Sequence, residues 1–202
     1  MMLLRTSPPS PYGRKIKIAA SLLNLEKDIT LETADTNDAA DSLRVQNPLG
    51  KIPTLVLADG LTLFDSRVIL EYLDHLAGGG KIIPAESGAR FRTLRLQALA
   101  DGVLDASLLL IYEIRFRPED RREKKWVDHQ TDKVKRGFDV LEKDPPVIGA
   151  MPDAGHIALA CALGYQDLRF QGTWRKSYPK LVAWLDDFAR RVPAFAKTKV
   201  EA

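Results

Sequence analysis

The sequence predicts two domains of different class, an α/β domain followed by an all-helical domain. In the first part of the chain, short strand-like runs alternate with helical patterns. After the stretch 78–88, which holds four glycines and a proline, strand signals disappear and helical patterns continue. We therefore expect an α/β domain over residues 1–77, a linker over 78–88 and an all-helical domain over 89–202.

The first domain is predicted to begin with the order strand, helix, strand, helix. Strands are expected over 2–5 and 28–33, and a weak helix over 38–45. Ser10-Pro11 is a strong helix start, because a hydroxyl can cap the free N–H groups and proline suits the first helical position. A right-handed crossover is expected between the two strands.

A hairpin and a third helix complete this domain. The Asn-Pro-Leu-Gly run that opens residues 47–66 favours a turn. Two short strands, 54–57 and 61–64, are joined by a tight turn. Asp65 is placed to cap a helix with apolar residues at helical spacing, which the glycines at 78–80 end. The complete order is that of a thioredoxin-like domain.

The second domain is predicted from four helical patterns. Helices are expected over 89–116 and 121–143, each stopped by proline, and another begins at Pro179. The pattern over 153–166 is apolar on most sides, so it is expected to form the core helix.

Composition excludes several classes of function. The chain has 202 residues, 45% of them hydrophobic and 28% charged, and its net charge of +3 is too small to argue for nucleic acid. No apolar run approaches the roughly 18 residues of a membrane span, and no signal peptide is recognised. A single cysteine, expected to be buried, agrees with a reducing compartment, and the histidines lack metal-ligand spacing. We expect a cytoplasmic protein without membrane, nucleic-acid or metal partners.

The run N-P-L-G-K-I-P at residues 47–53, with the hairpin and F-D-S at 64–66, resembles the glutathione-binding half of the soluble glutathione transferases. The pattern Y-P-x-L-x-x-W-x-x-x-F-x-x-R-x-P-A-F over 178–195 resembles the C-terminal helix pattern of that family. Together they extend the resemblance over nearly the whole chain. One departure is His156, which replaces the usual aspartate of a helix-capping box, with Asp153 expected as the cap.

The resemblance implies a glutathione site made by the loop and the third helix. Lys51 would pair with the glycine carboxylate of glutathione, and Ile52 would offer backbone groups to its cysteinyl part. Pro53 would follow a cis peptide bond, and Asp65 and Ser66 would hold the γ-glutamyl end. The alternatives are a solvated turn lysine at Lys51 and a simple helix cap at Asp65.

Ser10 is the catalytic candidate, because it occupies the place of the Cys or Ser in the Cys-Pro or Ser-Pro motif of several transferase classes. The thiolate of glutathione is the nucleophile, and a free thiol with a pKa near 8.5 is mostly protonated at pH 7. A hydroxyl at a helix N-terminus can stabilise the thiolate by a hydrogen bond and by the helix dipole. Ser7 and Thr6 are the spare hydroxyls, and Ser10 could also be only a cap.

The leading hypothesis is a bacterial, serine-type, homodimeric glutathione S-transferase, whose co-substrate glutathione attacks a small hydrophobic electrophile or a hydroperoxide. A non-catalytic binding or regulatory protein of the same fold, or a glutathione-dependent isomerase, is the alternative. In some classes an acidic residue at the place of Asp101 or Asp105 reaches the partner subunit's glutathione, although both can be ordinary helix charges. Arg115 and Tyr112 would line the second-substrate pocket or belong to a solvated helix junction.

Overall fold

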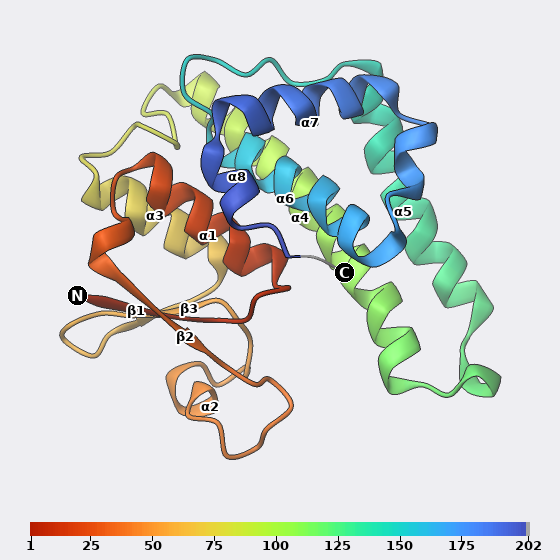
Figure 1. Cartoon of the computed structure of the whole chain (residues 1–202), viewed down its shortest axis with the longest axis horizontal. Coiled ribbons are helices and arrows are strands. Elements are labelled where there is room, and N and C mark those ends of the chain that lie inside the picture. Colours follow the sequence, from red (N-terminus) through yellow and green to blue (C-terminus); the bar gives the residue numbers. More distant parts are fainter. Residues whose placement is uncertain (201–202) are drawn as a thin grey trace. The chain divides into compact units, whose positions relative to one another are not determined.

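The computed structural model describes residues 1–200 of the chain. These residues divide into two compact units, one formed by Met1–Phe91 with Val192–Val200 and the other by Arg92–Arg191. The first unit contains a four-stranded sheet, and the regular structure of the second is helical (Figure 1). An α/β part and a helical part are the fold class that the sequence predicts.

The sheet of the first unit has the strand order β2-β1-β3-β4. Its strands are β1 (Met2–Thr6), β2 (Ile29–Thr33), β3 (Thr54–Val56) and β4 (Thr62–Leu63). β1 is parallel to β2 and antiparallel to β3, which is antiparallel to β4. Helices α1 (Pro11–Leu22) and α3 (Ser66–Leu76) pack side by side over the sheet (Figure 1). This is the predicted thioredoxin-like arrangement.

The core of the first unit lies between the sheet and these two helices. Leu4 of β1 pairs in register with Leu55 of β3, and both side chains are completely buried. Ile16 of α1 and Ile69 of α3 are also completely buried. Complete burial of such a side chain contributes about 1.5–3 kcal/mol to folding. The burial of these four side chains therefore holds α1 and α3 on the sheet.

The predicted helix over 38–45 is mostly absent, and only α2 (Leu43–Gln46) is helical. Three aspartates explain the difference. Asp35, Asp38 and Asp41 each accept a hydrogen bond from the backbone N–H two residues further on, at 2.7–2.8 Å. Side chains that bond to their own backbone in this way compete with helix formation.

The buried side chain of Arg5 attaches α2 to the sheet. Its guanidinium donates to Ser42 Oγ, Gln46 Oε1 and Asp41 Oδ1, each at 2.7 Å. A buried guanidinium is tolerated when its N–H groups are paired with acceptors of this kind. The start of the following loop at Asn47 is therefore fixed relative to β1.

The C-terminal segment of the first unit packs against α1. Here α8 (Pro193–Lys197) follows Val192, whose non-helical backbone (φ −123°, ψ 84°) agrees with the bias of a residue before proline against the helical conformation. Arg14 of α1 donates to Phe195 O at 2.5 Å and to Thr198 Oγ1 at 3.1 Å, and its guanidinium carbon lies 4.0 Å from the centre of the Phe195 ring. The sequence pattern over 178–195 thus covers two helices.

The second unit is built around α6 (Ala154–Phe170), which is buried along most of its length, as predicted for the core helix. The other elements are α4 (Ser87–Phe116), which starts in the first unit, α5 (Lys124–Lys143), α7 (Pro179–Arg191), and the 3₁₀ turns η2 (Glu119–Arg121) and η3 (Thr173–Lys176). The first unit has a further 3₁₀ turn, η1 (Glu26–Asp28).

The N-terminus of α6 confirms Asp153 as the helix cap. Asp153 Oδ1 accepts from the backbone N–H of His156 at 3.0 Å, and His156 Nδ1 accepts from the backbone N–H of Asp153 at 3.2 Å. His156 therefore supplies the second hydrogen bond of a capping box, in place of the usual acidic side chain. Its other ring nitrogen, Nε2, donates to Val147 O at 3.1 Å, which fixes the ring.

Helices α4 and α6 lie side by side and parallel within the second unit (Figure 1). Thr93 donates to Asp153 Oδ2 near the start of α6, and Gln166 donates to Ser107 Oγ near its end, both at 2.6 Å. Gly155 allows the close approach, since a Cβ atom there would lie 2.8 Å from the Thr93 carbonyl oxygen. Among residues 1–200, none of the helices is both long and apolar enough to span a membrane.

Candidate functional site

Ser10 is the N-cap of α1, as predicted. Its Oγ accepts a hydrogen bond from the backbone N–H of Gly13 at 3.1 Å, and Pro11 occupies the first helical position. The residue is only 8% exposed. A hydroxyl has two acceptor lone pairs and one donor hydrogen. Among the described residues, 1–200, that hydrogen has no acceptor, so the Ser10 hydroxyl can cap the helix and donate to a ligand at the same time.

The spare hydroxyls lie just before this helix. Thr6 is buried at the end of β1, where a Cβ atom on Gly13 would lie only 1.9 Å from Thr6 Oγ1. Gly13 is thus required for the close contact between α1 and β1. Ser7 is half-buried, and its carbonyl oxygen accepts from Ser10 N at 3.1 Å. Thr6 and Ser7 both lie next to the turn at Ser10, but neither caps a helix.

Residues 47–54 form a loop that is held from inside by Asn47. This side chain is 1% exposed, and its Nδ2 donates to Lys51 O at 2.9 Å and to Thr54 Oγ1 at 3.3 Å. Its Oδ1 accepts from Leu49 N at 3.0 Å. Two further hydrogen bonds close the loop, from Thr54 Oγ1 to Lys51 O at 3.0 Å and from Gly50 N to Asn47 O at 2.8 Å. Asn47 was predicted only as a turn residue, because its bonds to Lys51 and Thr54 depend on how the loop folds back.

The predicted ligand residues of this loop differ in exposure. Lys51 is exposed, Ile52 is half-buried and Pro53 is buried, and the Ile52–Pro53 peptide bond is cis, as expected from the resemblance. Thr54 pairs in register with Arg5, so Pro53 stands beside the end of β1. The exposed Lys51 side chain is accessible to a ligand.

Asp65 is the N-cap of α3, also as predicted. Its Oδ1 accepts from Arg67 N at 2.7 Å, and the Arg67 guanidinium pairs with Oδ2 at 2.8 Å. Ser66 is buried at the first helical position, and the Phe64–Asp65 peptide bond is cis. Burial acts to raise the pKa of the Asp65 carboxyl, but hydrogen bonds from Arg67 and the positive charges of Arg67 and Lys15 lower it overall. The carboxylate is therefore negatively charged at neutral pH and suited to an ammonium group.

Lys15 is a charged residue near this site that the sequence analysis did not select. It is completely buried in α1, with its Nζ 5.3 Å from the centre of the Tyr12 ring, and its charge acts on Asp65. In the sequence it is one of thirty basic residues, and nothing local marks it as buried.

The sheet topology brings Ser10, the 47–54 loop and Asp65 to one edge of the sheet. β1 ends just before Ser10, and β3 begins just after the loop. β4 ends just before Asp65, at the side where antiparallel β3 starts. The first unit thus has a hydroxyl, a lysine and a carboxylate at this edge of its sheet. These groups can bind a peptide-like molecule that has both an ammonium group and a carboxylate.

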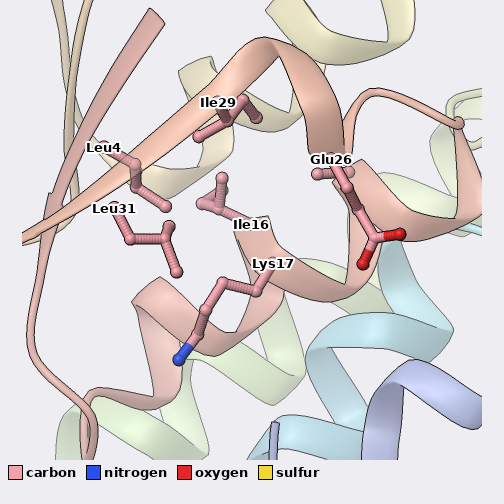
Figure 2. Close-up of a pocket in the computed structure, with 7 residues that line it drawn as sticks. Leu4, Ile16, Lys17, Glu26, Ile29 and Leu31 are labelled. Carbon is pink, nitrogen blue, oxygen red and sulfur yellow. The ribbon is translucent and has the colours of Figure 1, made fainter. Parts of the chain in front are cut away.

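A separate small pocket lies between α1 and β2 (Figure 2). Its volume is about 170 Å³, and its lining includes Leu4, Ile16, Lys17, Glu26, Ile29 and Leu31. The apolar side chains point into it, while the charged ends of Lys17 and Glu26 lie at its margin (Figure 2). None of the predicted site residues contributes to this pocket, so it is distinct from the candidate site.

The remaining predicted residues lie elsewhere. Asp101 and Asp105 are on α4 in the second unit, where Asp101 is buried and Asp105 is exposed. Cys161 is completely buried in α6, as predicted. Within residues 1–200 no three histidine, cysteine or acidic side chains are grouped as metal ligands would be.

Comparison with known proteins agrees with this geometry. Residues 9–76 match the family described as "Glutathione S-transferase, N-terminal domain", and residues 124–187 match "Glutathione S-transferase, C-terminal domain". The curated Escherichia coli K12 protein "Uncharacterized GST-like protein YibF" is 33% identical over 204 residues, covering 98% of each chain. A thioredoxin-like unit with a helical unit defines the class, and the chain belongs to the glutathione S-transferase family.

Two other relatives are informative. A crystal structure of a glutathione transferase family member from Pseudomonas fluorescens Pf-5 with bound glutathione is 38% identical, with a TM-score of 0.91 and 100% of each chain covered. A second structure of it contains S-(propanoic acid)-glutathione, with a TM-score of 0.88, 38% identity and coverage of 98% of this chain and 99% of that one. The "Stringent starvation protein A homolog" of Coxiella burnetii is 35% identical over 94 residues, or 46% of this chain and 43% of that protein.

Proposed function

We propose that the protein is a glutathione transferase in which Ser10 activates the thiol of glutathione. The main support for this proposal is the hydrogen bonding of the Ser10 hydroxyl. It is buried at the N-terminus of α1, accepts from Gly13, and keeps its hydrogen for a further acceptor. A sulfur atom placed there would receive a hydrogen bond and the favourable end of the helix dipole.

Glutathione would bind along the edge of the first unit that Ser10, the 47–54 loop and Asp65 share. The exposed ammonium of Lys51 suits the glycine carboxylate, and the backbone of Ile52 suits the peptide groups of the cysteinyl part. The ionised Asp65 carboxylate suits the γ-glutamyl ammonium group, with the buried Ser66 hydroxyl beside it. The glutathione bound to the Pseudomonas relative supports this ligand.

In the reaction, the thiol loses its proton to solvent and the thiolate sulfur attacks an electrophilic atom. A new bond from sulfur forms while the leaving group departs with its electron pair, or a double bond takes up a proton after addition. The role of Ser10 is to donate a hydrogen bond to the thiolate. Such a bond to a charged acceptor contributes roughly 1.5–3 kcal/mol, equivalent to about one to two units of thiol pKa.

The second substrate would be a small hydrophobic electrophile or a hydroperoxide. The S-(propanoic acid)-glutathione held by the Pseudomonas relative is a glutathione with a substituent on sulfur, which agrees with transfer of a group to that atom. We further propose that the protein acts in the cytoplasm as a homodimer, as members of its family do, and that Asp101 or Asp105 reaches the partner subunit's glutathione.

The test is calorimetric titration with glutathione, followed by an assay of adduct formation with a reference aryl halide. Saturable binding and adduct formation, both abolished by S-methylglutathione as a competitor, are expected. Absence of glutathione binding would contradict the proposal. Asp65→Asn and Lys51→Gln should each weaken binding, whereas Lys27→Gln, on the 3₁₀ turn before β2, serves as the charge-matched control.

A non-catalytic binding protein of the same fold is the second candidate. The observation that favours it is the match of 46% of the chain to a stringent starvation protein A homolog. Under this alternative the protein would bind glutathione without lowering its thiol pKa, or would not bind it at all. The intact set of Ser10, Lys51 and Asp65 favours the enzyme, because a scaffold has no need of all three.

A further inference from the structure

Strand β2 forms one edge of the sheet, and among residues 1–200 it pairs with β1 alone. Ala34 N, directly after β2, donates to Thr6 O at 2.9 Å. Because the N–H groups of successive residues point to opposite edges of a strand, those of Leu31 and Thr33 point away from β1. Four of the five β2 residues are exposed, so this edge can accept a further strand.

The small pocket between α1 and β2 lies on the helix side of this edge (Figure 2). Two of its lining residues, Leu4 and Ile16, are completely buried, whereas Leu31 is 56% exposed. The pocket is therefore closed toward the core and open beside β2. A cavity of about 150 Å³ can hold a molecule of the size of benzene, so one of about 170 Å³ has room for an aliphatic side chain.

The surroundings of β2 are acidic. Residues 26–38 contain five acidic side chains and one lysine, in a chain whose net charge is +3. All five acidic residues are exposed: Glu26, Asp28, Glu32, Asp35 and Asp38. A second copy of the chain would bring the same charges to this edge, and like charges at an interface repel each other. The surface is complementary to a basic partner.

We propose that the edge of β2 is a docking site for an extended basic segment of another protein. The segment pairs antiparallel to β2, which is the more stable kind of pairing, and its backbone bonds to Leu31. Successive side chains of a strand alternate between its two faces. Those of the segment that face α1 are aliphatic, and one enters the pocket, while those on the other face are basic and lie opposite Glu32 and Asp28.

The probe is the acetylated and amidated peptide TRVTVKT, titrated calorimetrically into the full chain. With its first valine opposite Leu31, its arginine lies opposite Glu32 and its second valine opposite Ile29. N-methylation of both valines removes N–H groups that face β2 and should weaken binding at least about tenfold. N-methylation of the arginine and the lysine, whose N–H groups face away from β2, is the matched control and should leave binding unchanged. The acidic peptide TEVTVET should bind at least about tenfold more weakly than TRVTVKT.

Two matched variants of the protein locate the docking site. Leu31→Lys places a positive charge on the edge and should reduce binding of TRVTVKT at least about tenfold. Leu61→Lys changes a leucine of the same exposure, 55%, just before β4, and should leave binding unchanged. In the unaltered protein, the peptide should slow hydrogen–deuterium exchange at the N–H groups of Leu31 and Thr33, because they become hydrogen-bonded.

No binding of TRVTVKT, equal binding of the two N-methylated peptides, or an equal loss of binding in Leu61→Lys would overturn the proposal. Slow exchange at Leu31 without peptide, becoming slower as the protein concentration rises, would also overturn it, because a second copy would then cover the edge. None of these measurements uses glutathione or changes a residue of its candidate site. Their outcome is therefore independent of the transferase proposal.

Discussion

Two helix N-termini in this protein carry the same kind of cap and use it differently. At α6, Asp153 bonds to His156 through Oδ1 and to Thr93 through Oδ2, and its own backbone N–H is bonded to the His156 ring. At α1, the Ser10 hydroxyl accepts one hydrogen bond, from Gly13, and retains its hydrogen. Asp153 thus has both carboxylate oxygens occupied, whereas Ser10 has a donor left over.

Asp153 is therefore a cap that only stabilises the fold, whereas Ser10 is a cap that can also donate a hydrogen bond to a ligand. Both are short polar residues before a helix, which is the usual sequence signal of an N-cap. What distinguishes them is the number of hydrogen-bonding groups left unused after the cap is made. The following changes test the comparison, in order of decreasing expected effect.

Asp153→Ala is expected to destabilise the protein by about 2–4 kcal/mol, because it removes the cap and leaves the Thr93 hydroxyl without its acceptor. Equilibrium unfolding in urea measures the change. Asp65→Ala removes an exposed cap and should cost about 1 kcal/mol. Equal losses in the two variants would contradict the view that the α6 cap is the more extensively bonded one.

Ser10→Ala should reduce the rate of glutathione conjugation at neutral pH by roughly 10- to 100-fold, because the thiolate loses a hydrogen bond worth about 1.5–3 kcal/mol. Its cost to folding should be only about 1 kcal/mol, and glutathione should still bind. A pH–rate profile measures the first effect and urea unfolding the second. Ser10→Thr, which keeps the hydroxyl, should retain much of the rate. An unchanged rate in Ser10→Ala would show that the activating group is Ser7, Thr6 or no side chain at all.

Asn47→Asp should raise the Kd for glutathione by about tenfold, because a carboxylate cannot donate to Lys51 O or Thr54 Oγ1 and the loop loses its fixed conformation. The pKa of the bound thiol should stay as in the unaltered protein, since Ser10 is untouched. Calorimetry measures the affinity. Asn37→Asp, at an exposed position, is the matched control, and an equal loss of affinity there would refute the positioning role of Asn47.

The smallest effect concerns acid stability at Asp153. Burial raises the pKa of this carboxyl, but hydrogen bonds from His156 and Thr93 and the charge of His156 lower it overall, below 3.8. A carboxyl whose pKa is lower in the folded state than in the unfolded state stabilises the protein at a pH above its unfolded-state pKa. This stabilisation disappears as the pH falls through the folded-state pKa. The stability difference between the unaltered protein and Asp153→Asn should therefore shrink below about pH 3.8 in urea unfolding. A stability difference between the two proteins that stays constant with pH would contradict a lowered pKa at Asp153.

The helix caps could be predicted from the sequence, because their hydrogen-bond partners are close along the chain. Ser10, Asp65 and Asp153 are each recognised as caps because their partners lie two or three residues away. Prediction was poorer where partners are distant. The bonds of Arg5 to residues 36–41 positions away fix α2, and the burial of Lys15 depends on packing across the unit.

The pairing of α4 with α6 shows the same limit. The hydrogen bond from Gln166 to Ser107, which joins the two helices, links residues 59 positions apart in the sequence. No periodicity in a single helix reports which other helix lies beside it.

The most direct test of the account is the ultraviolet thiolate absorbance of bound glutathione, titrated between about pH 5 and 9 in the unaltered protein and in Ser10→Ala. We predict a thiol pKa well below 8.5 in the unaltered protein and about one to two units higher in the variant. A thiol pKa near 8.5 in both proteins, with glutathione bound, would contradict the assignment of Ser10 as the activating group.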